Sequence, residues 1–334
     1  MWKSLISHGV HKGAIGGSFL LIGTQYILRK ESSSESKPLC KSVSVYASQG
    51  PRAGMEDEYF ISSDNSFFGV YDGHGGPKVS KLVRLNLFRI FEEELEKNTI
   101  PDAFMKSFAR VSEIILGDHS LDYQGTTAVT VLLEEDKIWT GNLGDSRAVL
   151  CTENGAVDIT TDHKPNSESE KSRIEQLGGD VSWYGYLGPD RQPVPGMGAY
   201  RINGNLAVSR AFGDSLERPF LSDIPDVKCF TRNKESDRFI ILASDGLWDV
   251  MSGKEAVRFV QQILAGSVGA LEEGRRTRRP SRPLNKWMRT YSGDSSMVRA
   301  VLDTRKSKIA KYLVEESLRR GTSDNVTVVV VWLR

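Results

Sequence analysis

The stretch Phe67-Phe-Gly-Val-Tyr-Asp-Gly-His-Gly-Gly76 guides the interpretation of the whole sequence. Its first five residues form a short hydrophobic run, which predicts a buried β-strand. Asp72 follows that strand directly and is therefore held in a fixed position, as a functional site requires. The glycines after it can form a tight bend, and they also let the backbone approach a ligand, so the Gly73 carbonyl could bind a metal. A single histidine such as His74 is more often a surface or hydrogen-bonded histidine than a catalyst, but its position two residues after Asp72 shifts the interpretation towards a general acid.

Strand-like and helix-like segments are grouped along the rest of the chain. Alternation or continuous apolar runs predict strands at residues 43–47, 126–133, 137–143, 147–151 and 326–333. Apolar residues at steps of three and four predict helices over residues 79–95 and 101–115. Two further helices have predicted capping boxes, formed by Ser167 with Glu170 and by Ser252 with Glu255. This grouping favours antiparallel sheets covered by helices, an α+β fold, over a βαβ repeat.

The charge balance of the chain limits the classes of protein that it can be. The 334 residues include 44 Lys and Arg and 43 Asp and Glu, so 44 minus 43 gives a net charge of +1. A protein that coats nucleic acid is usually strongly basic, and no nucleic-acid partner is expected. The three cysteines, Cys40, Cys151 and Cys229, form no CxxC pair or zinc-type cluster. We therefore expect free thiols and, if a metal binds, oxygen ligands.

The first 37 residues differ in composition from the remainder. Residues 1–30 lack Asp and Glu and contain the apolar, Gly-rich run 13–28. As a helix these 16 residues would span about 24 Å, less than the roughly 30 Å of a bilayer core. A mitochondrial targeting peptide, a short membrane anchor and a disordered tail all remain open, with a cytoplasmic location as the alternative to the first two. Residues 31–37 are predicted to be a solvated linker.

A second segment of unusual composition lies near the C-terminus. Residues 274–308 contain 11 Lys or Arg and only two acidic residues, together with Pro280 and Pro283. This composition predicts an exposed basic insertion at about residues 268–308 within a domain that spans residues 38–334. A solvated loop is one interpretation, and docking to an acidic partner or an anionic membrane is the other.

Carboxylates gather in four short motifs beside predicted strands. They are MED at residues 55–57, YDGHGG at 71–76, ASDGLWDV at 243–250 and SDNVT at 323–327. Each motif alone could be an ordinary turn or cap. Together they predict a site for a hard cation, Mg²⁺ or Mn²⁺, because clustered carboxylates without a cation repel one another and cost stability.

In combination and order, these motifs closely resemble the metal-dependent serine/threonine protein phosphatase family, type 2C. The resemblance covers residues 43–334 and includes nine motifs in one succession. They are RAGMED (52–57), YDGHGG, GTTA (125–128), GNLGDSRA (141–148), DHKP (162–165), RIEQLGG (173–179), NGNLAVSRAFGD (203–214), ASDGLWDV and SDNVT. The fold that the resemblance implies is an antiparallel β-sandwich flanked by helices on both faces.

The resemblance also implies roles for individual residues. Asp72 is expected to bridge two metals, with the Gly73 carbonyl as a further ligand, while Asp245 and Asp324 hold the second metal. Glu56 acts through a bound water, and Asp145 matches the position of a weaker third metal. Arg52 matches the arginine that grips the phosphate, and His74 matches the proposed acid.

A mechanism follows from those expected roles. Two metals lower the pKa of a bridging water, and the resulting hydroxide attacks phosphorus without a phosphoenzyme. Arg52 can bind two phosphate oxygens, and His74 can protonate the departing serine or threonine oxygen. The expected substrates are phosphorylated proteins in signal transduction, acted on by a monomeric catalytic domain. Thr126, Arg147, Lys164 and Arg210 are expected to support the site without taking part in the reaction.

Two departures from the family pattern leave alternatives open. Residues 180–199 are longer than the usual link and predict a projecting loop beside the site, which can alter substrate choice. The basic insertion is the second departure. A catalytically weak regulatory member of the same fold is one alternative, and a membrane scaffold built on the N-terminal segment is another. A cysteine-dependent phosphatase is disfavoured, because the residue six positions after each cysteine is not arginine.

Overall fold

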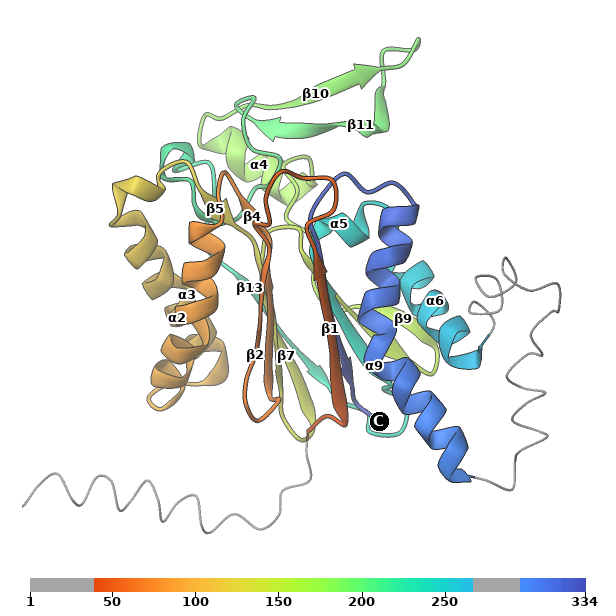
Figure 1. Ribbon diagram of the computed structural model, residues 1–334. Coiled ribbons are helices and arrows are strands. Elements are labelled where there is room, and N and C mark those ends of the chain that lie inside the picture. Colours follow the sequence, from red (N-terminus) through yellow and green to blue (C-terminus); the bar gives the residue numbers. More distant parts are fainter. Residues whose placement is uncertain (1–38, 267–294) are drawn as a thin grey trace, which may run out of the picture. The chain divides into compact units, whose positions relative to one another are not determined.

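The computed structural model describes residues 39–266 and 295–334 (Figure 1). Leu39–Arg334 form one compact unit. The predicted targeting or anchor segment, residues 1–37, and the greater part of the predicted basic insertion lie outside the described residues. Within the described ranges, no helix is both long and apolar enough to cross a membrane.

Two five-stranded antiparallel sheets form the centre of the compact unit (Figure 1). The first has the order β1-β15-β14-β8-β9, formed by β1 (Ser42–Ser48), β15 (Val326–Trp332), β14 (Phe239–Ala243), β8 (Arg147–Thr152) and β9 (Gly155–Asp158). The second has the order β13-β7-β6-β3-β2, formed by β13 (Asp226–Thr231), β7 (Lys137–Leu143), β6 (Ala128–Leu133), β3 (Phe67–Tyr71) and β2 (Glu58–Ile61). The strands predicted from apolar patterns are confirmed.

The two sheets pack face to face through their alternate residues. On β3, Phe68 and Val70 point into the layer between the sheets, whereas Phe67 and Tyr71 point to the opposite face. On β15, Val329 and Val331 belong to the inner layer, and its other valines belong to the outer one. Because a strand alternates its side chains, a strand that is covered on both faces must be apolar throughout.

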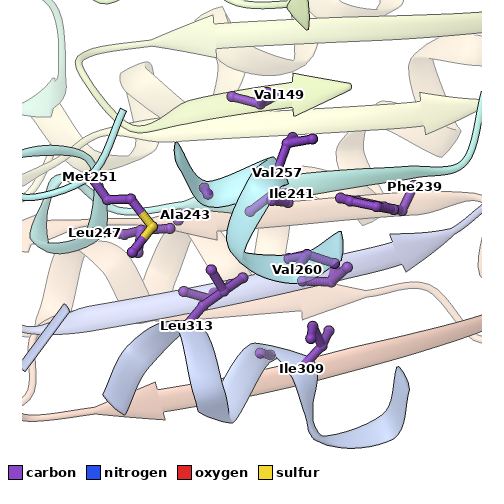
Figure 2. Packing of buried hydrophobic residues seen from close by; sticks show 14 of the residues in the cluster. Val149, Phe239, Ile241, Ala243, Leu247, Met251, Val257, Val260, Ile309 and Leu313 are labelled. Carbon is purple, nitrogen blue, oxygen red and sulfur yellow. The ribbon is translucent and has the colours of Figure 1, made fainter. Parts of the chain in front are cut away.

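Helices cover the outer face of each sheet, which gives four layers. The second sheet is covered by α2 (Lys78–Leu95) and α3 (Ile100–Leu116). The first is covered by α5 (Asp245–Trp248), α6 (Gly253–Ala265) and α9 (Ser295–Arg319). Figure 2 shows this packing, in which Val257 and Val260 of α6 and Leu313 of α9 lie against the sheet. The predicted α+β sandwich with helices on both faces is confirmed.

Two small sheets and α4 (Glu168–Gln176) lie at one end of the sandwich (Figure 1). A three-stranded sheet has the order β12-β5-β4, formed by β12 (Phe212–Gly213), β5 (Gly125–Thr126) and β4 (Gly73–His74). The segment predicted as a projecting loop is instead a β-hairpin, formed by β10 (Val181–Leu187) and β11 (Pro193–Ile202).

Two predicted features differ from the structure. The predicted insertion extends to residue 308, but residues 295–308 belong to helix α9, where Arg305 donates hydrogen bonds to the Ile263 and Leu264 carbonyls at the end of α6. The capping box of Ser252 and Glu255 is present, whereas that of Ser167 and Glu170 is not. Glu170 is buried against Arg173 and Arg210, which bind its carboxylate in place of the helix end.

Candidate active site

The strand register brings the four acidic motifs to one end of the sandwich. The end of β14 pairs with the start of β15, which places Asp245 near Asp324. The start of β2 pairs with the end of β3, which places Glu56 near Asp72. The start of β8 pairs with the end of β14, so the loop that carries Asp145 joins the same end. In Figure 1 this end carries α5 and β4.

Asp72 and Asp245 form the centre of this acidic cluster. The Asp245 amide donates to Oδ2 of Asp72 at 3.4 Å. Burial, followed by the charge of Asp245 and of other carboxylates, raises the pKa of Asp72 well above its ordinary value. Burial, followed by the charges of Asp145 and Asp249, does the same for Asp245. Oδ1 of Asp245 is buried and has no hydrogen-bond partner among the described residues.

Cationic side chains already neutralise two of the predicted metal ligands. Nη2 of Arg52 lies 2.5 Å from Oδ2 of Asp324, and Nζ of Lys164 lies 2.6 Å from Oδ2 of Asp145. In the described parts of the chain, no three acidic, His or Cys side chains converge closely enough to enclose a metal as they stand. Each of these two carboxylates is therefore paired with a positive charge from the protein itself.

The donor set fits a divalent cation. Its groups are carboxylate and carbonyl oxygens, which are the ligands that Mg²⁺ and Mn²⁺ prefer. An unpartnered, buried Asp245 oxygen is a group that a cation would satisfy. At Gly73, an added Cβ would lie 2.4 Å from the Glu56 carbonyl oxygen, so only glycine allows this close approach of the backbone.

Asn325 and Asp57 organise the cluster, and the sequence interpretation assigned neither of them a role. The Asn325 side chain donates to the Gln49 and Gly54 carbonyls and accepts from the Glu56 amide, which fixes the loop that carries Arg52 and Glu56. Asp57 accepts from the Ser244 hydroxyl at 2.8 Å. Burial raises the pKa of Asp57 to about 6, although the hydrogen bond from Ser244 lowers it. Their positions inside the MED and SDNVT motifs were the signal that could have identified them.

His74 lies at the edge of the acidic cluster, on β4. Its Nε2 is 2.6 Å from Oδ2 of Asp214. Burial lowers the pKa of His74, but the hydrogen bond to Asp214 and the charges of Asp214, Asp145 and Glu56 outweigh burial, so the pKa is raised. The imidazole therefore holds its proton more firmly than a free histidine does.

The residues expected to support the site make structural contacts. Thr126 donates its hydroxyl proton to the Asp72 carbonyl, which fixes the backbone at the end of β3. Arg147 binds both carboxylate oxygens of Asp162 and stacks on the Trp248 ring. Lys164 binds Asp145. Arg210 joins Glu170 of α4 to Asp226 at the start of β13.

Comparison with known families defines the class of this domain. The sequence model of protein phosphatase 2C matches residues 42–275. Probable protein phosphatase 2C 45 of rice (Oryza sativa subsp. japonica) is 34% identical over 296 residues, which cover 85% of each chain. The chain therefore belongs to the protein phosphatase 2C family of protein serine/threonine phosphatases.

Solved structures share the same architecture. The serine-threonine phosphatase 2C from Toxoplasma gondii superposes with a TM-score of 0.56 at 25% identity, covering 89% of this chain and 98% of that one. The catalytic domain of the phosphatase PstP, solved in complex with two manganese ions, superposes with a TM-score of 0.52 at 19% identity and covers 87% of this chain and 97% of its own. The second likeness concerns the fold alone.

Proposed function

We propose that this chain is an active, Mg²⁺- or Mn²⁺-dependent phosphatase that hydrolyses phosphoserine and phosphothreonine in proteins. The observation that carries the proposal is the pair of partly buried carboxylates Asp72 and Asp245, whose pKa values are raised by desolvation and by neighbouring negative charges. A fold does not retain such repulsion for stability, since apolar or neutral groups there would be more favourable. A divalent cation removes the repulsion.

The proposed ligands are the groups of this cluster. Asp72, the Gly73 carbonyl, Asp245 and Asp324 would hold two metals, Glu56 would act through a water, and Asp145 would hold a weaker third metal. Bound divalent cations supply positive charge at the phosphate and acidify the water that attacks phosphorus. A metal held by Asp324 or Asp145 would compete with the ion pairs that these carboxylates form with Arg52 and Lys164, and Arg52 would then be available to a phosphate.

The protein groups then act on the substrate directly. Arg52 is about half exposed, and its planar guanidinium can bind two phosphate oxygens at once in a fixed geometry, which lysine does less well. His74 can donate a proton to the departing serine or threonine oxygen, and its pKa is raised by the hydrogen bond to Asp214 and by nearby carboxylates, so the ring holds its proton more firmly than a free histidine does. Expulsion of an alkoxide without that proton would be slow.

Variants of the two central carboxylates test the proposal. With Mn²⁺, Asp72→Asn and Asp245→Asn are each expected to lower the hydrolysis of a phosphothreonine peptide by about 100-fold or more, because each removes a metal-binding charge. In EDTA the same variants are expected to melt at a higher temperature than the wild type, since one repelling charge is gone. Asp136→Asn, a change in an exposed turn, is the matched control.

Two results would contradict the assignment. One is near-normal turnover by either variant. The other is a melting temperature in EDTA that falls in both variants, which would mean that the charges stabilise the fold. A folded, metal-binding wild type without activity would instead favour the regulatory member of the fold.

A further inference from the structure

His74 and Asp214 meet across a glycine in the small three-stranded sheet. The central strand β5 pairs with β4 on one side and with β12 on the other. In this register Gly125 lies opposite His74 on one side and opposite Gly213 on the other. Asp214 follows Gly213 directly, so its carboxylate reaches over β5 to Nε2 of His74 at 2.6 Å.

Gly125 provides the space for this contact. A Cβ at residue 125 would lie 1.9 Å from Oδ2 of Asp214 and 2.4 Å from Nε2 of His74. Any larger residue would therefore separate the two side chains. The sequence motif GTTA begins with this glycine, and its role in the structure is to let the pair form.

The backbone also holds Asp214 in place for the contact with His74. The residue is buried and has a left-handed conformation with φ +48, and its amide donates to the Gln124 carbonyl. Asp214 precedes the short 3-10 helix η2 (Ser215–Glu217), but within the described structure its side chain makes no capping hydrogen bond to that helix. Its carboxylate points to His74 instead.

We propose that Asp214 is a positioning residue for His74 in the phosphatase reaction, an inference that rests on the proposed function. Because Nε2 is committed to Asp214, the ring presents Nδ1 to the leaving group. As the P–O bond breaks, the Nδ1 proton passes to the departing serine or threonine oxygen. The N–H electron pair stays on Nδ1, and the imidazole becomes neutral. Solvent then returns the proton.

The experiment compares two leaving groups. Phosphothreonine needs a proton for departure of its alkoxide, whereas p-nitrophenyl phosphate releases a stable phenolate and does not. Asp214→Asn keeps the shape of the side chain, and asparagine tolerates a left-handed backbone, so the variant is expected to fold. We expect kcat for a phosphothreonine peptide to fall about tenfold or more, and kcat for p-nitrophenyl phosphate to change less than about threefold.

A double-mutant cycle separates positioning from general support of the fold. His74→Gln is expected to show the same selectivity between the two substrates. Adding Asp214→Asn to His74→Gln is expected to cause no further loss, because the group that Asp214 positions is already absent. Gly125→Ala adds a methyl group between His74 and Asp214, and it is expected to reproduce the selective loss of activity on the phosphothreonine peptide. The melting temperature of this variant shows whether it is folded.

Failure of this inference differs from failure of the proposed function. An equal loss on both substrates, or additive losses in the double variant, would overturn the role of Asp214 while leaving the phosphatase assignment intact. A wild type that hydrolyses neither substrate with Mg²⁺ or Mn²⁺ would overturn both. Unchanged peptide hydrolysis in a folded Asp214→Asn variant would overturn the inference alone.

Discussion

Asn325 holds the loop that positions Arg52 and Glu56. Its amide nitrogen donates two hydrogen bonds, to the Gln49 and Gly54 carbonyls, and its oxygen accepts a third. The side chain is buried, so a lost partner cannot be replaced freely by water.

Substitution of this residue gives a sharp test at the residue scale. Asn325→Asp places a carboxylate oxygen against two carbonyls, and we expect the free energy of unfolding to fall by about 1–3 kcal/mol, measured in urea. Turnover of a phosphopeptide is expected to fall as well, because the Arg52 loop loses its anchor. Asn86→Asp, in helix α2, is the matched control, since Asn86 also donates to a backbone carbonyl. Equal stability losses in the two variants would contradict the special role of Asn325.

The contrast between the two Ser-x-x-Glu segments shows what a local pattern can predict. Both have the sequence of a capping box, yet only Ser252 and Glu255 form one. Glu170 has two arginines close to it in the fold, Arg173 in the same helix and Arg210, which is 40 residues away in sequence. Charge-assisted hydrogen bonds to arginine are stronger than a cap, and the partner from a distant segment is invisible to a local pattern.

The Glu255 capping box makes a testable contribution at the element scale. Hydrogen bonds from Ser252, followed by Arg320, lower the pKa of Glu255 from 4.5 to about 2. A lowered pKa in the folded state means that the stabilisation is complete above about pH 4.5 and is lost as the pH falls towards 2. Glu255→Gln keeps the cap but not the charge. Its melting temperature is therefore expected to fall less than that of the wild type as the pH is lowered from 4.5 to about 2. Glu113→Gln, on the exposed face of α3, is expected to leave this fall unchanged, and equal slopes in both variants would contradict the assignment.

At the scale of the whole molecule, the sandwich was predictable because the signal repeats along the chain. Strands such as β15, which are covered on both faces, must be apolar throughout, and the predicted amphipathic helices cover the outer faces. The segment at residues 181–202 was not predictable as a hairpin, since its prolines and glycines also fit a loop.

The candidate site was likewise predictable only in part. The acidic residues were predictable from their motifs at strand ends, which the antiparallel register gathers at one end of the sandwich. The contacts of Asp214 and Asn325 were not, because each depends on residues more than 100 positions away in sequence. Hydrogen bonds of that range follow from the register of the sheets, and composition or periodicity carries no information on them.

The N-terminal segment adds a separate hypothesis about the location of the protein. We propose that residues 1–36 direct it to a membrane or to mitochondria, since they combine basic residues with an apolar run and residues 1–30 lack acidic ones. A fluorescent reporter fused to residues 1–36 is expected to concentrate at one of these places in cells. A diffuse cytosolic signal, equal to that of the reporter alone, would contradict both versions.

The central claim is that the acidic cluster makes this chain a metal-dependent phosphatase. The most direct test is phosphate release from a phosphothreonine peptide by the purified full-length chain, first in EDTA and then after addition of Mg²⁺ or Mn²⁺. We predict no release in EDTA and rapid release with either metal. Release that is independent of metal, or none at all from a folded chain shown to bind Mn²⁺, would contradict the claim.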